Sequence, residues 1–182
     1  MDQTVLKNRT FDELTIGESA SLMRIVGRDD IDLFATVSGD VNPAHLDAAF
    51  AATDMFGHVV AHGMWTAALV SAVLGTRLPG PGTIYLGQDL HFHRPVAPGD
   101  TITVTVTVRE KRPEKRVVML DTRCANQRGE EVLSGTATVI APERQITWPR
   151  AKLPEVSLRR NDRYEDFVKQ ARALPAPRAA IV

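Results

Sequence analysis

Residues 63–78 read GMWTAALVSAVLGTRL, and this stretch decides the fold that the sequence predicts. Small residues recur in it at helical spacing, while Trp65, Leu69 and Leu74 fill the other sides. A helix that is apolar nearly all round is expected to be buried. The run Pro79-Gly80-Pro81-Gly82 ends it, because proline cannot continue a helix and glycine favours a turn. We therefore expect one long buried helix at the centre of the domain.

The chain after this helix has the pattern of β-strands. Residues 101–108 alternate threonines with Ile102, Val104, Val106 and Val108, and a period of two indicates a half-buried antiparallel strand. The other strands are expected over residues 21–26, 83–92, 116–125 and 132–140. A sheet wrapped around the helix buries an apolar face of each, so the sequence predicts an α+β fold.

Short helices are expected before the long one. Asp29 or Asp30 can cap a helix that carries Ile31, Phe34 and Ala35 on one face. Asp47 can cap a second helix that runs through Ala51, because the alanines there have good helix propensity.

Between these helices lies Ser38-Gly39-Asp40-Val41-Asn42-Pro43-Ala44-His45. Asn42-Pro43 turns the backbone, since a residue before proline avoids the helical region and proline fixes its own φ. The carboxylate of Asp40 and the imidazole of His45 can then converge on one water molecule and move its protons. Each also has a structural interpretation, Asp40 as a helix cap and His45 as a half-buried histidine.

His62-Gly63 opens the long helix, where the first N–H groups lack internal partners and carry partial positive charge. Gly63 lets a ligand approach its amide closely, and a thioester carbonyl lodged there would be polarised. The alternative is a plain helix start. His58 with His62, or His91 with His93, has a spacing that suits a metal ion. No third ligand of clear spacing accompanies either pair, so we expect no metal.

Composition narrows the class of protein. The 182 residues carry 22 basic and 22 acidic side chains, so the formal net charge of zero favours neither nucleic acid nor an anionic membrane as a partner. The single Cys124 excludes an intrachain disulfide and is expected to be a buried structural thiol. No secretory signal pattern or membrane-spanning apolar run is evident, which makes a cytoplasmic protein the default expectation.

Three separated motifs resemble one family. These motifs are residues 34–45 with Ala51, His62-Gly63-Met64, and residues 82–88. All three are similar to the MaoC-like (R)-specific enoyl-CoA hydratases, and the resemblance covers roughly residues 15 to 140. The resemblance implies a hot-dog fold, a helix wrapped by a curved antiparallel sheet, which usually dimerises through sheet edges. It also implies (R)-specific hydration of trans-2-enoyl-CoA to (R)-3-hydroxyacyl-CoA, with coenzyme A thioester as substrate and no metal or redox cofactor.

The same resemblance assigns roles to individual residues. It makes Asp40 and His45 the catalytic pair, without fixing which is the acid and which the base. It implies that the amide of Gly63 binds the thioester carbonyl. Substrate contacts are expected from Asn42, in the turn, and from Ser71 and Leu74, which correspond to positions that line the acyl pocket.

Two other functions fit the same fold. A hot-dog thioesterase normally carries a carboxylate on the long helix, but residues 63–78 contain no Asp or Glu. A non-catalytic acyl-CoA-binding or dimerisation module would be expected to have lost Asp40 or His45, and both are present. Hydration therefore remains the preferred prediction.

The end of the chain differs in character from the rest. We expect a hydratase domain over residues 1–145, followed by a linker and a short helix over 146–182. Asn161-Asp162-Arg163-Tyr164 and the final Ala179-Ala180-Ile181-Val182 resemble the opening of phosphate acetyl/butyryltransferase domains. This suggests a fused second enzyme that begins here. The alternative is a tail packed across the domain surface.

Overall fold

The computed structural model describes residues 4–159 and 169. The chain divides into two compact units, Met1–Lys152 and Leu153–Val182. In the second unit, residues 153–159 have no regular secondary structure. The expected C-terminal helix and the segment that resembles an acyltransferase lie outside the described residues, apart from Lys169, which is helical.

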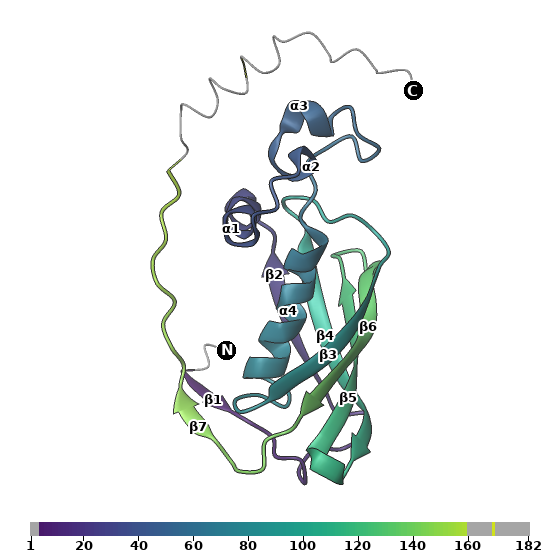
Figure 1. Cartoon of the computed structure of the whole chain (residues 1–182), viewed down its shortest axis with the longest axis vertical. Coiled ribbons are helices and arrows are strands. Elements are labelled where there is room, and N and C mark those ends of the chain that lie inside the picture. Colours follow the sequence, from purple (N-terminus) through teal and green to yellow (C-terminus); the bar gives the residue numbers. More distant parts are fainter. Residues whose placement is uncertain (1–3, 160–168, 170–182) are drawn as a thin grey trace, which may run out of the picture. The chain divides into compact units, whose positions relative to one another are not determined.

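The first unit contains one long helix, several short helices and two antiparallel sheets (Figure 1). Its elements in chain order are β1 (Val5–Lys7), β2 (Ser19–Ile25), α1 (Arg28–Ser38), α2 (Pro43–Leu46), α3 (Ala48–Ala51), α4 (Gly63–Thr76), β3 (Ile84–Phe92), β4 (Thr101–Arg112), a 3₁₀ turn (Glu114–Arg116), β5 (Val117–Ala125), β6 (Glu131–Ile140) and β7 (Thr147–Pro149).

The larger sheet has the strand order β2-β4-β5-β6-β3, with every pair antiparallel. Buried and half-buried residues alternate along β4, so that Ile102, Val104, Val106 and Val108 form the core face. This confirms the predicted half-buried strand, which continues further, to Arg112. Cys124 on β5 pairs with Val104 and is fully buried, as expected of a structural thiol.

Helix α4 lies along the concave side of this curved sheet, which is the expected hot-dog arrangement (Figure 1). Trp65, Val70, Val73 and Leu74 are buried on the face that packs on the sheet. The expectation that α4 would be buried all round is wrong for a single chain. The sheet covers only one face of the helix, and the opposite face is exposed at the positions Met64, Ala68, Ser71 and Gly75.

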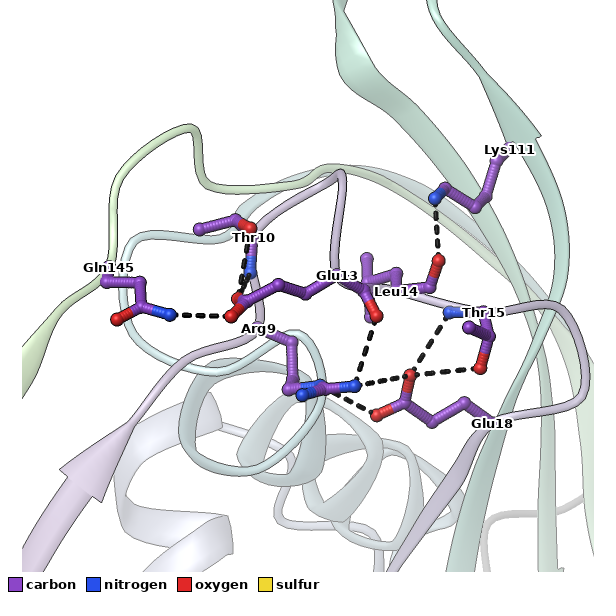
Figure 2. Close-up of polar contacts among 8 residues, drawn as sticks. All are labelled: Arg9, Thr10, Glu13, Leu14, Thr15, Glu18, Lys111 and Gln145. Carbon is purple, nitrogen blue, oxygen red and sulfur yellow. Dashed lines mark hydrogen bonds and ion pairs between the residues drawn. The ribbon is translucent and has the colours of Figure 1, made fainter.

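Side-chain hydrogen bonds hold the segment between β1 and β2 together and link it to the larger sheet (Figure 2). The guanidinium of Arg9 lies 2.9 Å from the Glu18 carboxylate, and Lys111 on β4 donates to the carbonyl of Leu14 at 2.6 Å. The Glu13 carboxylate accepts from the amide and hydroxyl of Thr10, and these hydrogen bonds lower the pKa of Glu13. The loop thereby closes one end of the core over Leu14, which is buried.

A second, two-stranded sheet joins the two ends of the first unit. β1 pairs antiparallel with β7, and Leu6 lies opposite Trp148. Neither strand was predicted, and residues 147–149 were expected to belong to a linker. With this pairing, the first compact unit runs through Lys152, and the domain boundary expected at residue 145 stays a prediction.

Helix α1 begins two or three residues earlier than expected from its acidic residues. Its N-cap is Gly27, and the carboxylate of Asp30 accepts from the Gly27 amide at 2.8 Å. Asp30 therefore serves as the third residue of a capping box and not as the cap itself. The cap predicted at Asp47 is confirmed, since its carboxylate accepts from the amides of Ala49 and Phe50. Within residues 4–159, no helix has the length and apolarity needed to cross a membrane.

Candidate active site

Asp40 is held by the turn that follows α1. The helix ends at Gly39, whose φ of 76° lies in the left-handed region that glycine adopts without steric cost. The Asp40 amide then donates to the Ser38 hydroxyl at 3.2 Å, and the Asp40 carboxylate accepts from the Asn42 amide at 3.2 Å. These local bonds fix the backbone on both sides of Asp40 and leave its side chain exposed.

His45 is carried by the short helix α2, which Asn42 and Pro43 start. The side chain of Asn42 accepts from the Ala44 amide at 3.1 Å, and Pro43 stands at the first turn, where a missing N–H costs nothing. The ring of His45 reaches across to the next segment, where its Nδ1 lies 2.8 Å from the Val60 carbonyl oxygen. A carbonyl only accepts, so Nδ1 carries a proton, and in the neutral form of the ring Nε2 is the nitrogen with the lone pair.

A third residue, His62, joins Asp40 and His45. One side-chain donor atom from each of the three lies within 4.8 Å of the other two. The ring of His62 lies against that of His45, with centroids 3.9 Å apart, and its Nε2 is 2.9 Å from the backbone carbonyl oxygen of Asp40. Asp40 is exposed, His45 half-buried and His62 buried. The structure thus brings together the predicted pair over the N-terminal end of α4.

A cavity of about 300 Å³ opens at this end of α4. His45 and Gly63 line it beside apolar side chains. The ring of Phe92 crosses directly over Gly63, since a Cβ built on that glycine would stand 2.9 Å from Phe92 Cε1. Further lining residues include the apolar Phe56, Val60, Val96 and Val132 and the polar Thr66, His93 and Arg94. The cavity therefore combines a helix N-terminus and a mostly apolar wall with polar side chains, which suits a ligand that has polar groups on an apolar chain.

The other predicted site residues, Asp40, Asn42, Ser71 and Leu74, do not line this cavity. Asn42 lies in the same turn as Asp40 and makes a local cap. Ser71 is exposed two turns further along α4, and Leu74 is buried in the core. Neither residue lines the cavity. The substrate contacts expected of Asn42, Ser71 and Leu74 stay predictions.

The sequence pattern did not predict that His62 lies against Asp40 and His45. It indicated only a helix start or half of a pair with metal-ligand spacing, because a contact with a backbone carbonyl 22 residues away leaves no local pattern. It also gave no role to Phe92, which ends a strand and reaches Gly63 only through the fold. The sequence feature that comes nearest to indicating this arrangement is His62-Gly63, a histidine directly before a glycine at a helix start.

The cluster of Asp40, His45 and His62 also has the composition of a metal site, two imidazoles and a carboxylate. Each member already has a local partner: Val60 for His45, the Asp40 carbonyl for His62 and the Asn42 amide for Asp40. The same three side chains suit proton transfer equally well, so only a measurement of the reaction distinguishes metal binding from acid–base catalysis at this cluster.

Comparison with known proteins defines the class. Residues 7–127 match the family described as the MaoC like domain. The chain is 49% identical over 134 residues to an (R)-specific enoyl-CoA hydratase of Rhodospirillum rubrum, which covers 74% of this chain and 92% of the relative. It is 44% identical over 142 residues to a 3-hydroxybutyryl-CoA dehydratase of Methylorubrum extorquens, covering 78% of this chain and 89% of that one. The chain belongs to the MaoC-like family.

Solved structures agree with this membership. The R-hydratase PhaJ1 from Pseudomonas aeruginosa in its unliganded form superposes with a TM-score of 0.81 at 47% identity, over 85% of this chain and 99% of that one. An (R)-hydratase from A. caviae superposes with a TM-score of 0.69 at 44% identity, over 71% of this chain and 98% of that one. The predicted hot-dog fold is confirmed.

Proposed function

We propose that this chain catalyses the reversible, (R)-specific hydration of a trans-2-enoyl-CoA to an (R)-3-hydroxyacyl-CoA. The observation that carries the proposal is the convergence of the Asp40 carboxylate and the His45 imidazole beside the N-terminus of α4. Two relatives of 44% and 49% identity that cover most of this chain are named (R)-specific enoyl-CoA hydratases, and a third, of 44% identity, is named a 3-hydroxybutyryl-CoA dehydratase, which is the reverse reaction. Proximity of an acid–base pair to a helix N-terminus is what hydration of a conjugated thioester needs.

The proposed chemistry uses both members of the pair. One member removes a proton from a water molecule whose oxygen bonds to the β-carbon of the enoyl group. The electrons of the double bond move toward the thioester carbonyl, and the other member delivers a proton to the α-carbon. The lone pair at Nε2 of His45 and the exposed carboxylate of Asp40 are both suited to either role.

Gly63 supplies the third element of the proposal. The negative charge that develops on the thioester oxygen is stabilised by the Gly63 N–H and by the partial positive charge of the helix N-terminus. The residue that caps α4, His62, makes no side-chain hydrogen bond to the first turn, so the capping residue does not occupy these N–H groups. Glycine is needed at this position because the Phe92 ring already fills the space that a Cβ would take.

The proposed reaction requires no metal or redox cofactor. Addition of water leaves the overall oxidation state of the substrate unchanged, and the helix N-terminus supplies the polarisation that a Lewis acid would give. We therefore expect the turnover of the purified protein to survive exhaustive dialysis against a chelator. Loss of turnover that is restored by one particular metal would assign the cluster of Asp40, His45 and His62 to metal binding instead.

The direct test follows the ultraviolet absorbance of the conjugated enoyl thioester while a parallel sample reports free thiol. Loss of the absorbance without release of thiol is the result expected of a hydratase. Release of free coenzyme A would identify a thioesterase, and an unchanged spectrum with saturable binding would identify a non-catalytic module. Repeating the assay over a series of acyl lengths measures how turnover depends on the length of the acyl chain.

We also propose that two copies associate through β3. In the described part of the chain, β3 is an edge of the larger sheet, and edge strands offer unpaired N–H and C=O groups to a partner. Ile84 and Leu86 on this strand are more than half exposed. We expect sedimentation to report a dimer, and Leu86→Lys to shift it toward a monomer. A wild-type monomer at micromolar concentration would contradict the proposal.

A further inference from the structure

His62 is a buried polar residue whose environment a structural role alone does not explain. Its side chain is 2% exposed and stands at the N-cap of α4. N-cap side chains usually accept a hydrogen bond from the first turn of their own helix, but that of His62 does not. It turns away from α4, toward the loop between α1 and α2.

The contacts of His62 are with both members of the proposed catalytic pair. Nε2 lies 2.9 Å from the backbone carbonyl oxygen of Asp40. Since a carbonyl only accepts, Nε2 carries the proton and donates. The Asp40 carbonyl lies immediately next to the Cα from which the carboxylate projects, so this bond restrains the backbone that carries that side chain.

The ring of His62 also fixes the plane of His45. The two ring centroids are 3.9 Å apart with an interplanar angle of 35°, and the ring of Phe34 lies against His62 at 5.0 Å. His45 is thus constrained by the Val60 carbonyl through Nδ1 and by the face of His62. Two independent restraints of this kind leave its Nε2 only one direction.

Nδ1 of His62 is buried and has no hydrogen-bond partner. A buried polar atom without a partner costs free energy of folding, by roughly 1–3 kcal/mol for a typical group. An apolar residue of similar size would remove this cost, so stability alone does not call for histidine here. The cost is typical of a residue retained for its contribution to a functional site.

We propose that His62 is a positioning residue, which aligns the carboxylate of Asp40 through the backbone and the imidazole of His45 through ring contact. The inference rests on the proposed hydration and deepens it. His62 itself exchanges no proton with the substrate, because its donor nitrogen is occupied by the Asp40 carbonyl and its other nitrogen is buried.

The test compares His62→Gln with His62→Leu. Glutamine keeps an N–H at about the reach of Nε2, whereas leucine has a similar volume and no donor. We expect His62→Leu to lower kcat by about 10- to 100-fold, the range found when supporting hydrogen-bond partners are removed, with KM nearly unchanged. His62→Gln is expected to recover a substantial part of kcat. His91→Leu, which changes an exposed histidine on β3, serves as the matched control.

The decisive comparison repeats His62→Leu in an Asp40→Asn background. A residue that acts only by aligning Asp40 and His45 as a pair loses its effect once the pair is broken, so we expect the second substitution to change kcat by less than about threefold. A loss of the full 10- to 100-fold in both backgrounds would overturn the proposal. So would equal losses in His62→Gln and His62→Leu together with equally lowered melting temperatures, which would indicate a packing role.

A readout that needs no turnover separates this inference from the proposed function. Ring ¹⁵N resonances of the wild type should report a proton on Nε2 of His62 and on Nδ1 of His45. His62→Leu should shift the ring signals of His45, while His91→Leu should not. Unchanged His45 signals in His62→Leu would contradict the positioning role, even in a protein that failed to hydrate any enoyl thioester.

Discussion

Nδ1 of His45 lies 2.8 Å from the carbonyl oxygen of Val60, fifteen residues further along the chain. This contact sets the tautomer of the ring, because the carbonyl accepts and Nδ1 must donate. Nε2 is then the nitrogen that retains the lone pair. The backbone of the segment before α4 therefore prepares the imidazole for proton transfer.

Replacing His45 by asparagine should separate the two properties of the ring. The amide nitrogen of asparagine can still donate to Val60, so we expect the melting temperature to stay close to that of the wild type. No group remains to exchange a proton, and turnover should fall by about 10²- to 10⁴-fold. Steady-state kinetics on a short enoyl-CoA measures the loss. His91→Asn is the control, and near-normal turnover in His45→Asn would remove His45 from the mechanism.

Asp40→Asn removes charge and basicity while keeping the shape of the side chain. The amide oxygen can still accept from the Asn42 amide, and the backbone bond to His62 is untouched. We predict a loss of kcat of at least about 10²-fold with unchanged far-ultraviolet circular dichroism. Asp12→Asn, an identical change at an exposed loop position, should leave kcat as it is. An equal loss in both variants would point to a general effect of charge.

Gly63→Ala tests the close approach at the helix tip. The added Cβ meets the Phe92 ring at 2.9–3.3 Å, so the ring must move into the cavity. Because a displacement near 1 Å at an active site can cost about 10²-fold, we expect kcat/KM to fall about 10- to 100-fold.

Two further variants make this test specific. Gly63→Ala combined with Phe92→Ala should recover activity relative to Gly63→Ala alone, since the truncated side chain no longer meets the new Cβ. Gly75→Ala, in the same helix with nothing within 4 Å of the added Cβ, should preserve activity and slightly stabilise the helix. A loss in Gly75→Ala as large as in Gly63→Ala would show that the contact with Phe92 is irrelevant.

Cys124 gives a prediction about pH. Burial raises the pKa of its thiol to about 12, from an ordinary value of 9.0. The thiolate is the reactive form, so the native protein should not react with a thiol reagent at about pH 8, whereas the unfolded chain should react at its one cysteine. Rapid labelling of the native state would contradict this burial.

The same shift has a consequence for stability. A group whose pKa is raised by folding stabilises the folded state fully below its ordinary pKa and loses that contribution as pH rises through the folded value. The free energy of unfolding should therefore decline between about pH 9 and pH 12 more steeply in the wild type than in Cys124→Ala. Urea denaturation of the two proteins side by side measures the difference.

Much of the fold could be predicted because its signals are local. The alternation over residues 101–108 and the apolar pattern over residues 63–78 each specify an element and the face it buries. The β1–β7 pair was missed, because strands of three residues are too short to show a period. The exposed face of α4 was mispredicted, since an apolar pattern does not reveal how many neighbours cover it in one chain.

The site divides in the same way. The convergence of the Asp40 and His45 side chains could be predicted because Asn42-Pro43 turns the chain between them and their separation is short. His62 reaches Asp40 across 22 residues, and Phe92 reaches Gly63 across 29, so only the folded arrangement brings them together. The family resemblance added Ser71 and Leu74, which lie away from the cavity in this chain.

The most direct measurement compares turnover in Asp40→Asn, His45→Asn and the double variant on one enoyl-CoA substrate. Residues that act as a unit on the same water molecule lose nearly all of their effect once either is removed. We predict that the double variant is no more than about tenfold slower than the slower single variant. Losses that multiply in the double variant, or near-normal turnover in either single one, would contradict the joint action of Asp40 and His45.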